Sequence, residues 1–137
     1  MGNQHDEYGK KLFEGIRDFS IEYADCNTKY GERGRGSRID GVIGKKIAIE
    51  IESRVSKQIR GAILDLTLHL NPRKLLILMP VHMNNPEITK SQSIFILKKL
   101  LDRDQFEVVL LKGTGDKEAF IEDKKRIRIA LKALGIN

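Results

Sequence analysis

Apolar residues recur along this chain at two different periods, and together these periods predict a mixed α/β protein. Over residues 5–22 they fall at every third or fourth position, which indicates an amphipathic helix, and a short strand is expected around 21–25. Over 37–43 and 47–52 the period changes to two, which predicts two strands joined at Gly44-Lys45-Lys46. The first part of the chain is therefore a helix followed by hairpin strands.

The later part of the sequence predicts strand–helix crossovers. A helix that Ser53 or Ser56 can cap carries one apolar stripe and stops at Asn71-Pro72. The stripe consists of Val55, Ile59, Ala62, Ile63, Leu66 and Leu70. The remaining expected elements are a nearly continuous apolar strand over 74–79, a helix near 89–102, a strand over 106–111 and a helix from Asp116 to about Leu134. This order predicts a mixed sheet with helices on both faces.

Three carboxylates lie on the two hairpin strands, at Asp40, Glu50 and Glu52. Side chains alternate along a strand, so Glu50 and Glu52 share one face. Like charges this close raise each other's cost of ionisation unless a cation lies between them. The pattern therefore indicates a divalent-metal site.

The register of the hairpin decides whether these acids meet. The register that pairs Ile43 with Ile47 sorts the strands into an apolar and a polar side. Its further pairs are Gly41 with Ile49 and Ile39 with Ile51 on the apolar side, and Asp40 with Glu50 and Arg38 with Glu52 on the polar side. A two-residue turn at Gly44-Lys45 is the alternative, and it shifts the register by one and mixes the two sides. We favour the first register for its clean sorting, although the turn chemistry alone does not decide.

Two facing carboxylates can share one ion. The predicted ligands of Mg²⁺ or Mn²⁺ are Asp40, Glu50 and the main-chain carbonyl of Ile51. Water bound to such an ion is more acidic and can attack a phosphodiester. The competing interpretation is a set of solvated strand acids neutralised by Arg38 and Arg54.

The sequence has an acid, Asp40, then acid-x-Glu on the next strand, Glu50 to Glu52, and then a helix. This pattern resembles that of the PD-(D/E)XK nuclease superfamily, whose fold is restriction-endonuclease-like. The resemblance covers roughly residues 5–80 and implies an αβββαβ core with a mixed central sheet flanked by helices, here followed by an α-β-α extension. Glu52 occupies the family's lysine position, as in some restriction endonucleases of this fold, which implies a base or a second-metal ligand. The run Gly9-Lys-Lys-Leu-Phe-Glu14 is similar to a first-helix pattern that supplies a further acid, which implies a supporting role for Glu14.

The charge balance is basic, with 25 Lys and Arg against 19 Asp and Glu and a formal charge of +6. Such an excess favours a polyanionic partner such as nucleic acid. The loop before Asp40 is rich in arginine, which suits phosphate contacts, and in glycine, which lets the backbone approach. The predicted DNA contacts are Arg33, Arg35, Arg38, Arg54 and Lys57.

Size and composition narrow the remaining classes. The chain has 137 residues, which predicts a single domain over 1–137. Its one cysteine, Cys26, a polar amino terminus and the lack of a long apolar run predict a cytoplasmic protein without a membrane span. Gly113-Thr-Gly115 matches neither a P-loop nor a dinucleotide fingerprint, so no organic cofactor is expected.

The sequence thus predicts a Mg²⁺-dependent DNA endonuclease. A small nuclease of this kind must cut both strands, so a homodimer is expected. The first alternative is a catalytically inactive nuclease-like module that binds DNA or protein. The second is a small oligomeric α/β protein whose acids pair with arginines and which binds no DNA.

Overall fold

The computed structural model describes residues 4–21, 39–54 and 57–136. The helices of the described residues are α1 (Gln4–Lys11), α2 (Lys57–Leu68), α3 (Pro86–Leu100) and α4 (Lys117–Ala133). The strands of the described residues are β1 (Phe19–Ser20), β2 (Gly41–Ile43), β3 (Ile47–Glu52), β4 (Arg73–Leu78) and β5 (Phe106–Leu110). Short 3₁₀ turns lie at Pro80–His82 and Arg103–Gln105. The predicted order of helices and strands is confirmed.

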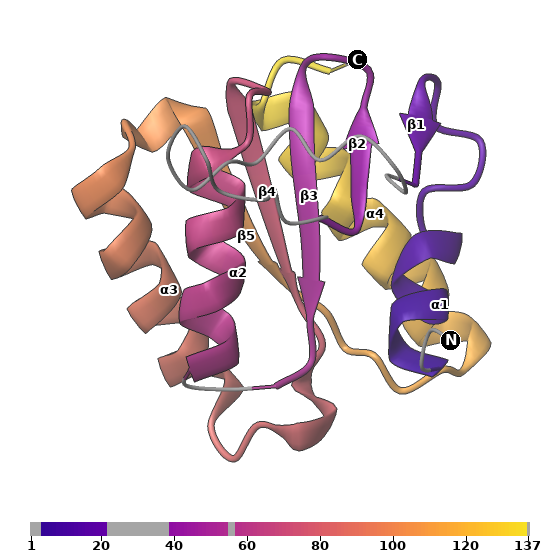
Figure 1. The fold of residues 1–137 in the computed structure, drawn as a ribbon. Helices are drawn as coiled ribbons and strands as arrows, with labels where there is room; N and C mark the ends of the chain where they lie inside the picture. The colour runs from indigo at the N-terminus through magenta and orange to yellow at the C-terminus, as the bar shows by residue number, and fades with distance from the viewer. Residues whose placement is uncertain (1–3, 22–38, 55–56, 137) are drawn as a thin grey trace.

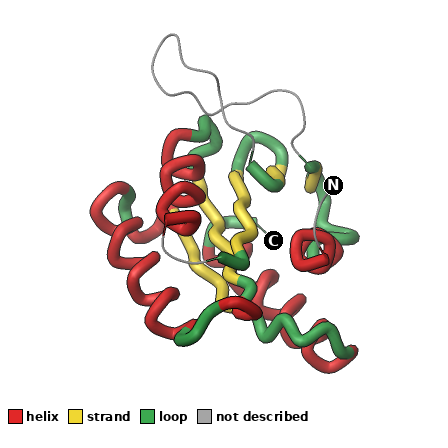
Figure 2. Tube along the Cα trace, turned by 60° about the horizontal axis from the view of Figure 1, so that its bottom comes forward, coloured by secondary structure: helices red, strands yellow, loops and turns green. Residues whose placement is uncertain are grey.

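The described strands form one mixed sheet in the order β1-β2-β3-β4-β5. β2 runs antiparallel to β1 and β3, whereas β3, β4 and β5 are parallel to one another. The crossover helices α2 and α3 both cover one face, as expected when crossovers of one hand advance along a sheet in one direction (Figure 1). Helices α1 and α4 cover the other face, and the tilted view of Figure 2 shows the sheet between the two helical layers.

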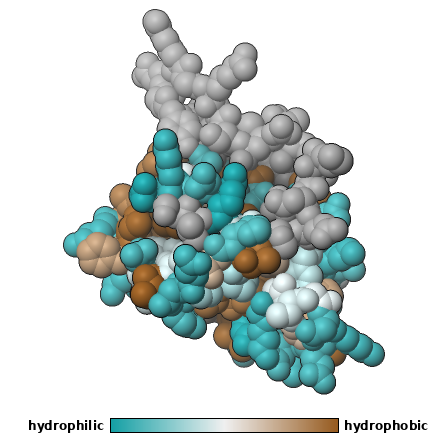
Figure 3. All heavy atoms as spheres, turned by 90° about the horizontal axis from the view of Figure 1, so that it is seen from below, coloured by the Kyte–Doolittle hydropathy of each residue, from teal (hydrophilic) through white to brown (hydrophobic). Residues whose placement is uncertain are grey.

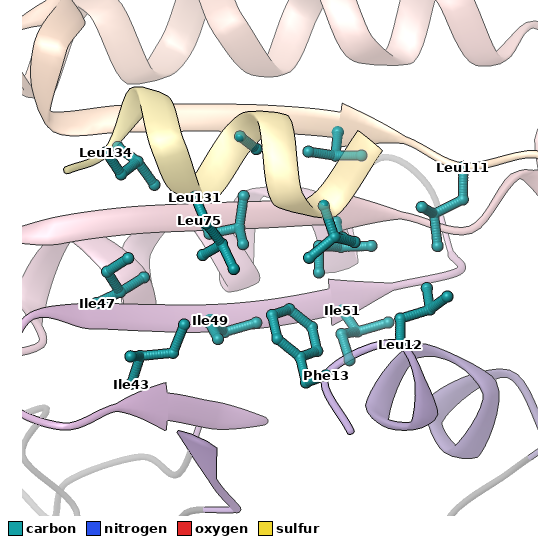
Figure 4. Packing of buried hydrophobic residues seen from close by; sticks show 14 of the residues in the cluster. Leu12, Phe13, Ile43, Ile47, Ile49, Ile51, Leu75, Leu111, Leu131 and Leu134 are labelled. Carbon is teal, nitrogen blue, oxygen red and sulfur yellow. The ribbon is translucent and has the colours of Figure 1, made fainter. Parts of the chain in front are cut away.

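Successive residues of the central strands supply two separate cores. Ile47, Ile49 and Ile51 of β3 point toward α1 and α4, where Leu131 of α4 joins them (Figure 4). Ala48 of β3 points the other way, into the cluster under α2 and α3. Because both faces are covered, five of the six residues of β4 are fully buried, which explains its nearly continuous apolar sequence.

The first helix is shorter than its apolar spacing predicts. α1 ends at Lys11, and the chain turns at Gly15, whose φ of 83° lies in the left-handed region. Phe19 then belongs to β1 and stacks on Phe13 at a ring-centroid distance of 4.7 Å. The apolar residues after Leu12 are thus buried by a turn and an edge strand, and the predicted helix over 5–22 was wrong beyond residue 11. A strand lies at Phe19–Ser20, and most of the strand expected at 21–25 falls on residues 22–38, which lie outside the described residues.

Two further differences concern the ends of elements. Leu70 was predicted to lie on the buried stripe of the second helix, but α2 ends at Leu68 and Leu70 is 77% exposed. Of the strand predicted over 37–43, Gly41–Ile43 form β2, Ile39 and Asp40 precede it, and residues 37 and 38 lie outside the described residues. Pro80 follows β4 as expected, and Asp116 caps α4 by accepting a hydrogen bond from the amide of Ala119 at 2.9 Å.

Candidate active site

The β2–β3 hairpin has the register that sorts its polar and apolar sides. Ile43 pairs with Ile47, and the pairs Val42–Ala48 and Gly41–Ile49 follow. The amide of Lys46 donates to the carbonyl of Ile43 across the turn at 3.0 Å. The favoured register is therefore confirmed, and the one-residue shift is excluded.

The two acids of the predicted pair meet where the hairpin ladder ends. The amide of Asp40 donates to Oε1 of Glu50 at 2.9 Å, and the amide of Ile51 donates to Oδ2 of Asp40 at 2.7 Å. The Asp40 amide also lies 3.1 Å from the carbonyl of Ile49. Each carboxylate thus accepts a hydrogen bond from the other strand, and the two half-buried acids lie side by side.

Ile39, directly before the pair, does not lie where the extended register places it. It was predicted to face Ile51 on the apolar side, but it is buried in the cluster under α2 and α3, on the other face of the sheet. The chain bends at Asp40 and its amide serves Glu50, so the ladder does not continue to Ile39. The bend is what directs the carboxylate of Asp40 toward the end of β3.

The electrostatics of the pair are those of two acids that cannot both ionise at low cost. The pKa of Glu50 is raised to about 10, first by burial and then by the charge of Asp40, a hydrogen bond between the two carboxyl groups and the charge of Asp65, while the hydrogen bond from the Asp40 amide lowers it. In neutral solution Glu50 therefore keeps a proton unless a cation replaces it.

A third oxygen faces the same place. Met79 donates its amide to the carbonyl of Glu52 at 2.9 Å, so that carbonyl points toward β4. Carbonyls alternate in direction along a strand, and the carbonyl of Ile51 therefore points toward β2, where Asp40 lies. Asp40, Glu50 and the Ile51 carbonyl all offer oxygen, the ligand atom that a hard divalent cation prefers.

Glu52 is held differently from the other two acids. Its side chain is 9% exposed, and Oε2 accepts hydrogen bonds from the amides of Ser53 and Arg54 at 3.0 and 2.8 Å. Nε of Arg54 lies 3.1 Å from the same oxygen, while the Arg54 side chain stays 66% exposed. Arg54 therefore neutralises Glu52, as the competing interpretation expects, but Glu52 is buried and not solvated, and it anchors the connection between β3 and α2.

The other predicted site residues are not gathered by the described structure. Glu14 is exposed in the turn after α1, a helix that packs on the sheet face opposite the side chain of Glu50. Lys57 is exposed at the first residue of α2. Arg33, Arg35 and Arg38 lie outside the described residues.

The sequence interpretation missed one acid, Asp65 of α2. It is half-buried, and its negative charge contributes to the raised pKa of Glu50. The available signal was an acid within the otherwise apolar run Ile63-Leu64-Asp65-Leu66.

Searches of family models, curated proteins and solved structures find no match to this chain. In the part of the chain that the structure describes, no three or more His, Cys, Asp or Glu side chains are grouped to hold a metal ion, so a site here would rely on two carboxylates and a carbonyl. No helix of the described residues combines the length and the apolar character needed to cross a membrane.

Proposed function

We propose that this protein is a metal-dependent endonuclease that hydrolyses phosphodiester bonds in DNA and has the restriction-endonuclease-like fold. The observation that carries the proposal is the reciprocal hydrogen bonding that brings Asp40 and Glu50 together at the end of β3. The order α1-β1-β2-β3-α2-β4 supports it, because it is the αβββαβ order of that fold. The remaining α3, β5 and α4 extend the sheet by one strand and cover it.

Asp40, Glu50 and the carbonyl of Ile51 would hold Mg²⁺ or Mn²⁺. A bound divalent ion supplies an acidified water and stabilises negative charge on the phosphate. The protein side of the site fits this use, because two half-buried carboxylates that repel each other gain most from a shared cation. The charge of Asp65 on α2 has a smaller effect on Glu50 in the same direction and thereby favours the cation further.

Glu52 and Arg54 would act together beside the metal ligands. Oε2 of Glu52 already accepts three hydrogen bonds, so we assign Glu52 to positioning and not to proton abstraction. The exposed guanidinium of Arg54 would supply the positive charge that a lysine supplies in most of the superfamily. Lys57, exposed on the first turn of α2, would contact a neighbouring phosphate. Arg33, Arg35 and Arg38 stay predicted DNA contacts, and Glu14 stays a predicted supporting acid.

The direct test is plasmid cleavage with and without Mg²⁺ or Mn²⁺. We expect nicked and linear products from the wild type, and none from Asp40→Asn or Glu50→Gln. Glu118→Gln, which removes an exposed acid on α4, is the matched control and should cleave normally. Calorimetric titration should show Mn²⁺ binding that both acid variants lose. Cleavage by a correctly folded Asp40→Asn or Glu50→Gln protein would refute the assignment.

A duplex needs one cut in each strand, so the proposal includes a homodimer with one site in each subunit. Sedimentation of the wild type with and without a short duplex should give the mass of two chains in the active state. An active species that sediments as one chain would exclude this part of the proposal.

A nuclease-like DNA-binding module without catalysis is the second candidate. The observation that favours it is Glu52, an acid that is paired with Arg54 at the family's lysine position. This candidate predicts salt-sensitive DNA binding that neither Mn²⁺ nor loss of Glu50 changes. Mn²⁺-dependent cleavage excludes it.

A further inference from the structure

Two adjoining hollows lie at the turn end of the β2–β3 hairpin, away from the acid pair. One, of about 470 Å³, lies between the turn after α1 and the last turns of α4. The other, of about 560 Å³, lies between that turn, the hairpin turn and the end of the chain. Arg17 and Ile136 line both, so the two hollows are continuous, and we call them the basic groove. Its cations are Arg17, Lys45, Lys46, Arg128 and Lys132.

Local backbone geometry brings these segments together. Asp18 has a φ of 67°, in the left-handed region, and its carbonyl accepts the amide of Gly44 at 3.0 Å, which ties the approach to β1 to the hairpin turn. α4 ends at Gly135, where the amide of Ile136 donates to the carbonyl of Leu131 at 2.8 Å. This end folds Ile136 back against the core and places α4 beside the hairpin turn (Figure 1).

The charge of the groove differs from that of the rest of the surface. Among the described residues, five cations and one acid, Asp18, line it, whereas the whole chain has 25 basic and 19 acidic residues. All five cations are exposed, and within residues 4–21, 39–54 and 57–136 none of them forms an ion pair. By contrast, Arg73, Arg103, Lys112 and Arg126 elsewhere on the protein each pair with an acid.

We propose that the basic groove binds the phosphate backbone of duplex DNA outside the point of cleavage. The identity of the polyanion as DNA rests on the proposed function. Lys46 directly precedes β3, and Glu50 follows it by four residues, about 13 Å, which corresponds to the rise of about four base pairs along a DNA axis. The groove would set affinity and salt dependence, while the acids would act on one phosphate.

A structural role is the competing explanation for two of these cations, because basic side chains near the carboxyl end of a helix interact favourably with the helix dipole. Arg128 and Lys132 lie on the last turns of α4 and fit that role. Lys45 and Lys46 lie on a hairpin turn, where it does not apply. The two pairs of cations can therefore be tested separately.

The experiment measures binding of a fluorescent duplex to the full chain, without divalent ions, over a series of salt concentrations. The groove variants are Lys45→Gln/Lys46→Gln and Arg128→Gln/Lys132→Gln. Lys98→Gln/Lys99→Gln, which removes two exposed cations from α3 on the other face of the sheet, is the control with the same charge change. We expect each groove pair to lower the slope of log K against log salt by about 2 and the affinity by about tenfold, and the control to stay near wild type.

Equal behaviour of groove and control variants would overturn the proposal. A lower unfolding temperature of Arg128→Gln/Lys132→Gln without a change in DNA binding would also overturn it. So would groove variants that lose binding to anionic vesicles but bind DNA as the wild type does. The DNA-binding experiment and the cleavage assay can fail independently of each other. A wild type that never cleaves, but loses DNA affinity only in the groove variants, keeps the groove and rejects the nuclease. A wild type that cleaves, together with groove variants that bind DNA normally, keeps the nuclease and rejects the groove.

Discussion

The β2–β3 hairpin carries opposite charges at its two ends, and burial makes the two ends behave differently. At the open end, Asp40 and Glu50 are half-buried and hydrogen-bond across the strands. At the turn end, Lys45 and Lys46 are exposed and belong to a groove of several cations. Charges in a poorly hydrated place interact strongly, whereas exposed charges are screened by water and salt. The acid end is thus suited to hold one ion firmly, and the basic groove to hold an extended polyanion through several weak contacts.

The surroundings of the acid end agree with this division. Figure 3 views the molecule from the end where β3 finishes, and hydrophilic side chains cover much of the coloured surface there, with hydrophobic ones in small patches. A polyanion can approach such a surface without displacing a large apolar contact. The comparison between the two ends leads to four predictions.

The largest expected effect separates the two ends by kinetics. Asp40→Asn and Glu50→Gln should lower kcat for DNA cleavage at least about 1,000-fold, because the transition-state charge loses its stabilisation. Lys45→Gln/Lys46→Gln should raise KM and leave kcat unchanged at saturating DNA. Steady-state cleavage at a series of DNA concentrations measures both. A groove variant that lowers kcat as strongly as an acid variant would abolish the distinction.

The second prediction concerns the pH dependence of stability. The pKa of Glu50 is raised from its ordinary 4.5 to about 10 in the folded protein. The folded state therefore keeps a proton that the unfolded state releases. The contribution of Glu50 to metal-free stability is thus complete below about pH 4.5 and is lost up to about pH 10, by at most about 1.4 kcal/mol per pH unit. Chemical denaturation at several pH values measures this slope.

Mg²⁺ or Mn²⁺ should restore stability most at the alkaline end of that range, because the cation replaces the proton between the acids. Glu50→Gln should remove both the slope and the effect of the cation, while Lys45→Gln/Lys46→Gln should keep both. An unchanged slope in Glu50→Gln would show that other groups cause it.

The third prediction tests whether Glu52 acts through Arg54. Glu52→Gln and Arg54→Gln should each lower kcat about 10- to 100-fold, and the double variant should lose no more than the larger single loss. Arg103→Gln and Glu107→Gln, from an ion pair elsewhere in the protein, are the matched controls. If Glu52 is instead the base, Glu52→Gln should remove the acidic limb of the pH–rate profile and its loss should add to that of Arg54→Gln.

The smallest expected effect is at Asp18, the one acid among the described residues that line the groove. Asn tolerates the left-handed backbone that Asp18 adopts, so Asp18→Asn removes the charge at little cost in stability. We expect DNA affinity to rise about two- to threefold, with a weaker gain at high salt. Fluorescence anisotropy measures the affinity, and thermal unfolding provides the control. Unchanged or weaker binding by the folded variant would mean that DNA does not enter the groove.

Comparison of the helices shows when a local pattern suffices to predict structure. α2 and α4 follow from their apolar stripes, their end signals and the cap at Asp116, because each element buries its own periodic face against the sheet. The prediction of the first helix was wrong beyond residue 11, although Ile16 and Phe19 continue the helical spacing of apolar residues. The turn at Gly15 lets Phe19 stack on Phe13 from an edge strand, and such a contact between two elements has no signature in the period.

The candidate site also has features that the sequence pattern predicts and features that it does not. Alternation and the sorting of polar and apolar residues were enough to predict the hairpin register and the Asp40–Glu50 pair. They were not enough to predict that Arg54 holds Glu52, since that contact forms where the chain leaves β3. Asp65 was missed because its effect on Glu50 depends on how α2 lies over the sheet.

The sequence by itself determined the order of elements, the hairpin register and the two acids that face each other, because these depend on periods of two and 3.6 residues and on short-range pairing. Only the tertiary structure decided that Glu50 is buried deeply enough to keep its proton, that Asp65 adds to its cost of ionisation, and that cations from three separate segments line one groove. These properties depend on distance and solvent access between residues far apart in the chain, and chain spacing does not encode either.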